Sequence, residues 1–373
     1  MSIVEMESKK NILVLTNKTG GLHSFRKEVM KAIVDAGYEL YISVPDEDER
    51  IKFFEDIGCH IIKTRFDRRG MNPVKDLKLM IDYRKLIKKI KPKAVLTYTI
   101  KPNVYGGLAC RFTNTPQLAN VTGLGDAIEN GGWLQRLTVT LYRIGLKKAA
   151  CVFFQNESNR NTCIGLGIAD DGSVLLPGSG VNLDHHKYQE YPVDDGITRF
   201  LFIGRLLKDK GIEEYFETAQ AIKEKFPNTE FQILGAIDGP YQTKLEELTN
   251  LGVVKHLGLT TDVRPYIAAV NCTIMPSYHE GMSNVNLESQ AAGRPVITTN
   301  VPGCKETVDD GSTGYLAEAK NSKSLIAAVE RFIALPYSQK VEMGQNGREK
   351  VKREFDRRIV IDAYLKALDK LDK

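Results

Sequence analysis

The chain has 373 residues, of which 42% are hydrophobic and 27% charged, a globular composition with enough length for two domains. It contains no run of about eighteen apolar residues, and its first residues lack a long apolar core, so we expect neither a membrane-spanning helix nor a signal peptide. The net charge of +5 is mild, and no recognised nucleic-acid-binding module accompanies it, which argues against a nucleic-acid partner.

The first half of the chain alternates short β-branched runs with amphipathic stretches. Gly37 follows the first amphipathic stretch and is a normal C-terminal stop for a helix. Because the β-branched runs are almost continuously apolar, this half is expected to form a parallel sheet covered by helices on both faces. Strands are predicted at 11–17, 39–45, 60–65 and 94–99, and helices at 24–37 and 46–58.

A basic segment extends from the third of these strands to the fourth. Residues 63–93 contain twelve Lys and Arg against three Asp, and the plain interpretation is a solvated helix face. The second interpretation is binding to an anionic membrane surface, because apolar residues recur at helical spacing among the lysines. These apolar residues are Leu77, Met80, Ile81, Ile87 and Ile90.

The same alternation restarts with a strand predicted at 199–205. A segment rich in glycine, proline and charged residues precedes this strand, and we place the domain boundary there. The predicted fold class is therefore α/β, with two doubly wound Rossmann-like domains, residues 1–185 and 186–354, that face a central cleft. Ligands of open parallel sheets bind at the carboxyl ends of the strands, so the site is expected in the loops there.

Three features that look like metal sites have plainer interpretations. Asp46 and Asp48 form a D-x-D pattern, but they follow Pro45 at a predicted helix start, where acids meet the positive end of a helix. His185 and His186 have no acid or cysteine at ligand spacing and are expected to be solvated. The six cysteines are scattered, without a C-x-x-C pair, and indicate reduced cytosolic thiols. We therefore expect no metal and no other cofactor.

A loop and a helix start follow the strand predicted to end at Pro276. Ser283 or Asn284 is suited to cap the helix, and Gly293 is suited to stop it. A helix start has unpaired backbone N–H groups and a partial positive charge, and both favour a phosphate. The segment is therefore a candidate phosphate site.

Two glutamates, eight residues apart, flank this helix start. Glu288 lies about one turn into the helix and can accept hydrogen bonds from two adjacent ribose hydroxyls. Glu280 lies in the loop and can accept from a sugar beyond the phosphates, and Gly281 lets the backbone come close. The spacing fits a ligand made of nucleoside, diphosphate and sugar, although many surface helices have two glutamates at this spacing.

Two further motifs lie at predicted strand ends. Arg205 and Lys210 of "GRLLKDKG" are cations that can neutralise a diphosphate without a metal. Gly20 and Gly21 of "NKTGGLHSFRK" lie between the first strand and the first helix, where the plain interpretation is a tight turn with positive φ.

Together, the E-x7-E segment from Glu280 to Glu288, "GRLLKDKG" and the N-terminal Gly-Gly loop resemble the retaining glycosyltransferases of family 4, which have the GT-B fold. The resemblance extends over nearly the whole chain. Stretches such as "YTIKPNVYGGLAC", "FFQNESNR" and "LLPGSGVNLD" are most similar to the branch that assembles capsular polysaccharide and lipid-linked glycans. The resemblance implies that the C-terminal helix, predicted within residues 355–373, packs back on the first domain.

The resemblance also implies roles for the site residues. Glu280 contacts the donor sugar and Glu288 the ribose. Arg205 and Lys210 hold the donor diphosphate and, with Glu280, are the expected catalytic residues. The residues expected to bind the donor through backbone or loop contacts are Gly20, Gly21, Leu259, Gly281, Met282, Ser283 and Asn284.

One position departs from the family pattern. Many members have a His-Gly motif in the first domain near the reacting sugar, whereas this chain has Thr122 before Gly123. The front-face retaining mechanism proposed for such enzymes does without a histidine base, because the departing diphosphate oxygen takes the acceptor proton. Arg205, Lys210 and the helix start then stabilise the developing negative charge without a metal.

The resemblance therefore implies a metal-independent retaining hexosyltransferase. It moves a hexose or N-acetylhexosamine from a UDP-sugar to a sugar on polyprenyl (undecaprenyl) diphosphate, in capsule, O-antigen or glycan assembly. The enzyme is expected in the cytoplasm, held on the inner face of the plasma membrane by residues 63–93, with Arg26, Lys101 and Thr122 as candidate acceptor contacts. Two alternatives stay open: a UDP-sugar epimerase of GT-B fold, and a non-catalytic partner that binds nucleotide sugar or lipid.

Overall fold

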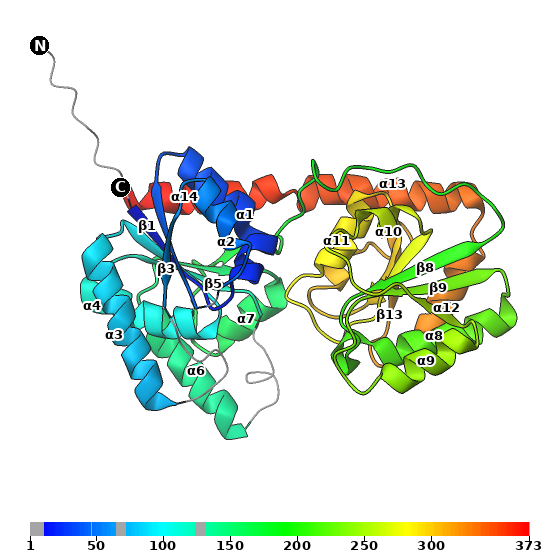
Figure 1. The fold of residues 1–373 in the computed structure, drawn as a ribbon, viewed down its shortest axis with the longest axis horizontal. Coiled ribbons are helices and arrows are strands. Elements are labelled where there is room, and N and C mark those ends of the chain that lie inside the picture. Colours follow the sequence, from blue (N-terminus) through cyan, green and yellow to red (C-terminus); the bar gives the residue numbers. More distant parts are fainter. Residues whose placement is uncertain (1–10, 46, 65–71, 124–131, 373) are drawn as a thin grey trace, which may run out of the picture. The chain divides into compact units, whose positions relative to one another are not determined.

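The computed structural model describes residues 11–45, 47–64, 72–123 and 132–372, and the chain divides into two compact units. The first unit consists of Met1–Ser179 with Val360–Lys373, and the second of Gly180–Ile359 (Figure 1). The chain thus returns to the first unit at its C-terminal end.

The first unit contains a seven-stranded parallel sheet with the strand order β3-β2-β1-β4-β5-β6-β7. The chain builds outward from β1 to β3 and then crosses back to β4, so the strand order reverses between β1 and β4. Such a reversal is the usual ligand position in a doubly wound sheet. The strands are β1 (Asn11–Leu15), β2 (Glu39–Val44), β3 (His60–Lys63), β4 (Ala94–Tyr98), β5 (Gln117–Val121), β6 (Cys151–Phe154) and β7 (Val174–Leu175).

Helices cover both faces of this sheet, as the apolar strands predict. Buried residues of α1 and α14 pack on one face, and those of α3, α4 and α6 on the other (Figure 1). The helices are α1 (Thr19–Asp35), α2 (Ile51–Asp56), α3 (Pro73–Ile90), the π-helical turn η1 (Pro102–Gly106), α4 (Gly107–Thr113), α6 (Gly132–Leu146), α7 (Glu157–Gly165), α14 (Arg357–Asp369) and η4 (Lys370–Asp372).

Tyr364 anchors the C-terminal helix α14 in the first unit. Its ring is fully buried and stacks on Phe153 with the centroids 4.7 Å apart. Its hydroxyl accepts a hydrogen bond from Arg26 Nε at 3.2 Å and also bonds to Asn120 Oδ1. A polar network therefore joins α14 to α1 and β5 across the hydrophobic core, which satisfies groups that would be costly to bury alone.

The second unit contains a six-stranded parallel sheet with the order β10-β9-β8-β11-β12-β13. Its order also reverses, between β8 and β11, so the same topological argument places a ligand there. The strands are β8 (Thr198–Ile203), β9 (Thr229–Leu234), β10 (Val254–His256), β11 (Cys272–Met275), β12 (Val296–Thr299) and β13 (Gly314–Ala317).

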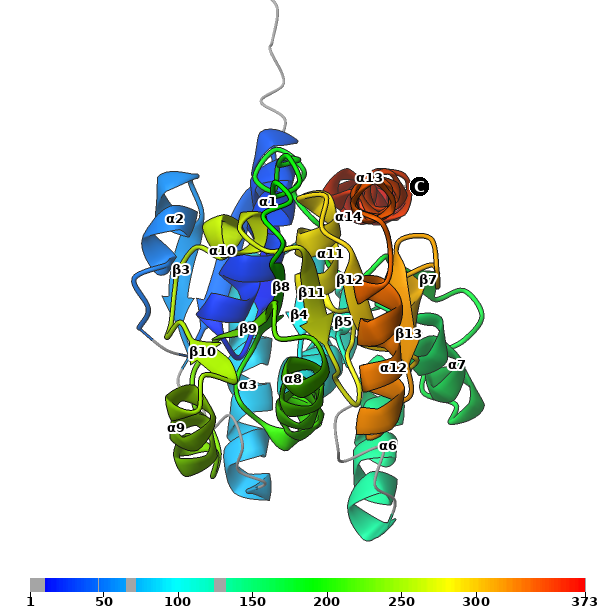
Figure 2. The same cartoon turned by 90° about the vertical axis from the view of Figure 1, so that its right-hand side faces the viewer.

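Helices also cover both faces of the second sheet. Buried residues of α8, α9 and α12 form the larger core with the sheet, joined by Met343 of α13, and α10, α11 and the rest of α13 lie on the other side (Figure 2). The helices are η2 (Lys208–Lys210), α8 (Ile212–Lys225), α9 (Gln242–Asn250), α10 (Arg264–Ala268), α11 (Asn284–Ala291), η3 (Lys305–Thr307), α12 (Ser322–Ile333) and α13 (Tyr337–Glu354).

Two predicted helices begin at other residues in the structure. The first helix starts at Thr19 instead of residue 24, and the second is limited to Ile51–Asp56. Asp48 accepts hydrogen bonds from both the backbone N–H and the side chain of Arg50, the residue before α2, and Asp46 lies outside the described residues. Within the described ranges, no helix has the length and apolar content needed to cross a bilayer.

The apolar stripe predicted on the basic helix α3 divides into two groups. Ile87 and Ile90 are buried in the core beneath the sheet, so their inclusion in a membrane-facing stripe was wrong. Leu77 and Ile81 are exposed, at 56% and 41%. A helix that packs on a sheet needs its own core face, and the sequence period alone does not separate that face from an exposed apolar one. Residues 65–71 of the basic segment lie outside the described residues.

The packing of α14 predicts the effect of shortening one of its buried side chains. Leu368 is fully buried in the first unit, so Leu368→Ala should destabilise that unit by about 2–5 kcal/mol, measured by urea unfolding followed by circular dichroism. Ile359 is 40% exposed on the same helix, and Ile359→Ala should change stability by at most about 0.5 kcal/mol. Equal urea unfolding midpoints for the two variants would contradict the observed packing.

Candidate active site

Lys210 and Glu280 form an ion pair at the carboxyl edge of the second sheet. Lys210 ends η2 after β8, and Glu280 lies in the loop between β11 and α11. Lys210 Nζ lies 2.7 Å from Glu280 Oε1, which also accepts a hydrogen bond from Ser277 Oγ at 3.0 Å. The side chains are 19% and 18% exposed, so the pair is accessible yet partly shielded from water. The structure thus brings together the expected diphosphate cation and the expected sugar-binding acid.

Close backbone packing holds η2 against the end of β11. Gly211 follows η2 with a φ of +71°, and a Cβ at this position would lie 2.0 Å from the Pro276 carbonyl oxygen. The Tyr278 N–H donates to the Asp209 carbonyl at 2.9 Å. Position 211 therefore requires glycine, because of both its φ and the space available.

Arg205 does not join the pair of Lys210 and Glu280. Its Nη1 lies 2.7 Å from Asp238 Oδ2, and more than half of each side chain is exposed. The sequence analysis did not single out Asp238. Exposed ion pairs contribute about 0–1 kcal/mol, so a ligand diphosphate could replace Asp238 as the partner of Arg205 at little cost.

Helix α11 begins as predicted, with Ser283 as its N-cap. Ser283 Oγ accepts from the Asn286 N–H at 3.4 Å. The Ser283 N–H itself donates to the Gly303 carbonyl at 2.7 Å, so this amide is already bonded, contrary to the expectation that it is offered to a ligand. Met282 is only 6% exposed and anchors the loop in the hydrophobic core, while Asn284 is half-buried.

The loop after β12 supports the Glu280 loop. The Glu280 N–H donates to the Pro302 carbonyl at 3.3 Å, and the Gly303 N–H donates to Glu306 Oε2 at 2.7 Å. Gly303 has a φ of +82°, and a Cβ there would lie 2.3 Å from the Glu280 carbonyl oxygen. The Pro302-Gly303 dipeptide indicates a turn in the sequence but not what the turn supports.

Glu288 lies in the second turn of α11, where burial raises its pKa to about 7 and Arg357 opposes that rise. About a quarter of the side chain, 24%, is still exposed. His186 Nε2 lies 4.0 Å from Glu288 Oε1, and burial lowers the pKa of His186 to about 4. The imidazole is therefore neutral at pH 7. The prediction that His186 is solvated was wrong, because the linker folds against α11.

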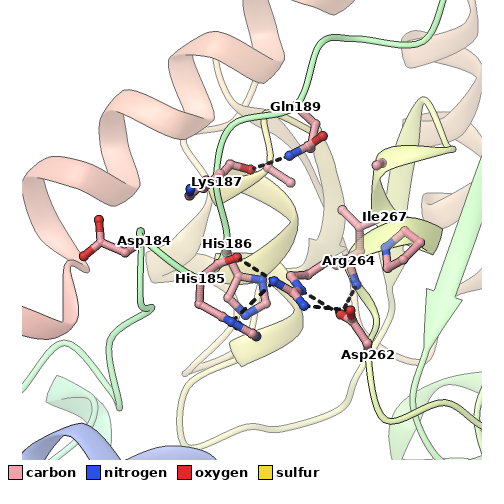
Figure 3. A pocket seen from close by; sticks show the side chains of 11 residues that line it. Asp184, His185, His186, Lys187, Gln189, Asp262, Arg264 and Ile267 are labelled. Atoms are coloured by element: carbon pink, nitrogen blue, oxygen red, sulfur yellow. Dashed lines mark hydrogen bonds and ion pairs between the residues drawn. The ribbon is translucent and has the colours of Figure 1, made fainter.

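His186 also lines a pocket of about 430 Å³ (Figure 3). Its walls come from the linker, from α10 with Asp262 before it, and from Ala292 at the end of α11. Arg264 makes two hydrogen bonds to the Asp262 carboxylate, at 2.8 Å each, and its Nη1 contacts the His185 carbonyl at 3.3 Å (Figure 3). Leu259, in the loop before these residues, is 75% exposed and does not line the pocket. A concave wall of charged and apolar groups thus adjoins the carboxylate expected to bind the ribose.

In the first unit, Gly20 and Gly21 belong to the first turn of α1, and neither has the positive φ of a tight turn. A Cβ at Gly20 would lie 2.7 Å from Arg50 Nη1, so this guanidinium lies directly on the helix start. The first turn contains no acid. The positive end of the helix favours an anion, and Arg50, which is paired with Asp48, brings a guanidinium to the same place.

The two cations expected at the acceptor are both engaged within the first unit. Arg26 is 3% exposed, and its Nε and Nη1 donate to Tyr364 and to the Phe25 carbonyl. Its burial against α14 leaves almost none of the side chain exposed, and its acceptor role stays a prediction. Lys101 Nζ pairs with Asp76 Oδ1 at 2.7 Å, and about a tenth of each side chain is exposed. An acceptor role for Lys101, and for the half-buried Thr122, stays a prediction.

Thr99, which no sequence pattern singled out, lies at the carboxyl end of β4 next to these residues. It has a φ of +74°, a strained conformation for a β-branched residue. Its Oγ1 is buried and has no hydrogen-bond partner within the described residues. The π-helical turn η1 follows it, and both backbone strain and π-turns occur preferentially at functional sites. Thr99 is therefore a further candidate at the ligand edge of the first sheet.

Two parallel-sheet Rossmann-like units in one chain, with candidate ligand groups at their strand ends, define the GT-B class of fold. Residues 11–156 match the family described as Glycosyl transferase 4-like, and residues 187–350 match Glycosyl transferases group 1. The chain belongs to these family 4 glycosyltransferases.

Relatives of known activity cover the chain. It is 26% identical to the N,N'-diacetylbacillosaminyl-diphospho-undecaprenol alpha-1,3-N-acetylgalactosaminyltransferase of Campylobacter jejuni, over 96% of this chain and 98% of that one. It is 28% identical to the UDP-Gal:alpha-D-GlcNAc-diphosphoundecaprenol alpha-1,3-galactosyltransferase of Escherichia coli, over 70% and 72% of the two chains. HepE of Anabaena, solved in complex with UDP and glucose, shares the fold with a TM-score of 0.78 and 18% identity, over 96% of this chain and 99% of that one.

The support of the Glu280 loop predicts a selective effect of one methyl group. Gly303→Ala should lower the transfer rate by about tenfold to a hundredfold, because the new Cβ displaces the Glu280 backbone. Gly311 has nearly the same φ, +81°, with nothing within 4 Å, so Gly311→Ala controls for backbone strain alone. Steady-state rates should fall for the first variant only. Equal rates for the two variants would contradict the positioning role of Gly303.

Proposed function

We propose that this glycosyltransferase is a metal-independent retaining enzyme that transfers a hexose or N-acetylhexosamine from a UDP-sugar to a sugar on polyprenyl diphosphate. The observation that carries the proposal is the contact between Lys210 and Glu280, which unites a diphosphate cation with a sugar-binding acid. The names of the Campylobacter jejuni and Escherichia coli relatives support the lipid-linked acceptor, and HepE with UDP and glucose supports the donor class.

In this proposal the donor diphosphate becomes the counter-ion of Lys210. Glu280 Oε1 is then released to accept from hydroxyls of the donor sugar, while Ser277 Oγ still donates to the carboxylate. Each charge-assisted hydrogen bond to the diphosphate contributes about 1.5–3 kcal/mol. Arg205 joins Lys210 by exchanging Asp238 for a phosphate oxygen.

The chemical step needs no protein base in this proposal. The bond between the anomeric carbon and the diphosphate oxygen breaks, and negative charge develops on the departing UDP, where Lys210 and Arg205 stabilise it. The acceptor hydroxyl attacks from the same face and gives its proton to the departing oxygen, so the anomeric configuration is retained. Because two side-chain cations neutralise the diphosphate, a metal ion is not required.

A lipid-linked acceptor would bring the enzyme to the cytoplasmic face of a membrane, and we include that location in the proposal. In the basic helix α3, the exposed apolar residues Val74, Leu77 and Ile81 recur on one side. Lys75, Lys78 and Lys85 accompany them in the exposed part of the helix. This distribution supports contact with anionic lipid.

The test is to incubate the protein with a panel of UDP- and GDP-sugars and an undecaprenyl diphosphate-linked sugar, in the presence of EDTA. We expect one UDP-sugar to be consumed, with UDP release that requires the acceptor and a product whose new linkage has the α configuration by NMR. Loss of turnover with EDTA would overturn metal independence, and an inverted product would overturn retention. Isomerised free donor, or no turnover with any donor, would favour the epimerase or the non-catalytic partner.

In the same assay, Lys210→Ala should lower kcat/KM by about 10²–10³-fold, as removal of a transition-state donor does in other enzymes. Lys208 lies in the same turn with 70% of its side chain exposed, and Lys208→Ala is the matched control with an unchanged rate. A near-normal rate for Lys210→Ala would contradict the proposed mechanism.

The raised pKa of Glu288 predicts a pH dependence of donor binding. The carboxylate that accepts from the ribose is present above about pH 7 and protonated below it. In the protein as isolated, kcat/KM for the donor should therefore fall about tenfold per unit as the pH is lowered below 7. The kcat/KM of the Glu288→Gln variant should be low at every pH and should not show this slope. An unchanged slope in the variant would assign the titration to another group.

A further inference from the structure

Helix α6 of the first unit exposes an apolar stripe. Trp133 is 70% exposed, Leu137 42% and Ile144 40%. These residues are four and seven positions apart, a spacing that places them on one side of a helix. Exposed apolar side chains that share one side of a surface helix are typical of a surface that contacts a partner or a membrane.

The opposite side of α6 packs firmly on the sheet, so the exposed stripe is not a poorly packed core. Val139, Tyr142 and Leu146 are 6%, 2% and 4% exposed and join the core with β5 and β6. A Cβ at Gly145 would lie 2.6 Å from the Val104 Cα, so the helix lies directly on η1. The helix is therefore a rigid support for the exposed residues.

The charged residues of α6 and its C-terminal extension are all basic. Between 132 and 148 the sequence contains no Asp or Glu. The exposed cations that border the apolar stripe are Arg136, Arg143, Lys147 and Lys148. An apolar row bordered by cations is complementary to a surface that is apolar inside and negatively charged outside.

The exposed residues of α3 lie at the same end of the unit. Both helices contact α4 and η1, and their first turns lie at the same end in both views (Figures 1 and 2). Val74 and Leu77 of α3 and Trp133 and Leu137 of α6 belong to those N-terminal halves. The two helices thus present apolar and basic residues at one end of the first unit.

We propose that α6, together with the exposed side of the first turns of α3, docks on an anionic phospholipid bilayer, with Trp133 and Leu137 inserted among the acyl chains. The inference rests on the proposed lipid-linked acceptor, and it assigns the membrane contact chiefly to α6 instead of the basic segment alone. A second copy of this chain fits less well, because the basic borders would repel each other. Nucleic acid offers no apolar layer for the stripe.

Trp133 is the sole tryptophan of the chain, so its fluorescence reports on this surface directly. Vesicles of phosphatidylglycerol and phosphatidylethanolamine should shift its emission to the blue, and lipids with brominated acyl chains should quench it. Phosphatidylcholine vesicles should do neither, and added salt should weaken the binding because the cations are exposed. An unshifted emission with the anionic vesicles would overturn the inference.

Two variants separate the apolar and the charged contributions. Leu137→Glu should weaken vesicle binding at least about tenfold, because it places an acid in the inserted row. The double variant Arg136→Gln, Lys147→Gln should weaken binding to anionic vesicles and reduce the salt dependence. Leu251 is 66% exposed in the second unit, and Leu251→Glu should bind like the unaltered protein. Circular dichroism checks that each variant is folded.

Equal vesicle binding by Leu137→Glu and Leu251→Glu would overturn the assignment to α6. A blue shift that grows with protein concentration in the absence of lipid would also overturn it, because a second copy would then cover the stripe. Vesicle binding and sugar transfer are measured separately. The transfer assay uses an acceptor with a short, water-soluble polyprenyl chain, so it does not require membrane binding. Loss of vesicle binding with transfer intact contradicts the docking surface alone, and loss of transfer with binding intact contradicts the proposed function alone.

Discussion

Close contact between backbone segments determines where the charged groups of the second unit lie. The turn that ends at Lys210 rests on the Pro276 carbonyl through Gly211, and the loop with Glu280 rests on Gly303. At both positions the neighbouring oxygen leaves no room for a Cβ, and the glycine has a positive φ. The short distance between the ammonium and the carboxylate is therefore a property of the backbone, which keeps the pair organised before a ligand arrives.

Partial burial gives the acids of this edge different properties. Glu280 has Lys210 and Ser277 as partners and stays accessible, whereas Glu288 is desolvated on α11, which raises its pKa to about 7. A carboxylate that is costly to ionise in the free protein gains more from hydroxyl donors when a ligand binds. The neutral His186 beside it adds no positive charge that would cancel this effect. In the proposed function, ribose binding would thus be coupled to loss of a proton from Glu288.

The first unit is organised around the return of the C-terminal helix. Tyr364 of α14 is hydrogen-bonded to Arg26 of α1 and to Asn120 of β5, and its ring stacks on Phe153 of β6. Helix α14 therefore links α1 to the sheet of the first unit. The first turn of α1, with Gly20 under the Arg50 guanidinium, is therefore positioned by contacts from the far end of the chain. The strained Thr99 at the end of β4 adds a polar group at the same carboxyl edge of the sheet.

The sequence by itself determined what depends on local chemistry: the parallel sheets, from alternating apolar strands and amphipathic helices; the cap at Ser283; and the types of charged group at the strand ends. Tertiary structure decided what depends on contacts between distant residues. It buried Arg26 and Ile87, paired Arg205 with Asp238, placed His186 beside Glu288, and put Gly303 against Glu280. A periodic pattern shows which face of a helix or strand is apolar. It contains no information on which distant segment packs against that face. That choice follows from how whole elements pack, because burial and pairing free energies depend on all neighbours at once.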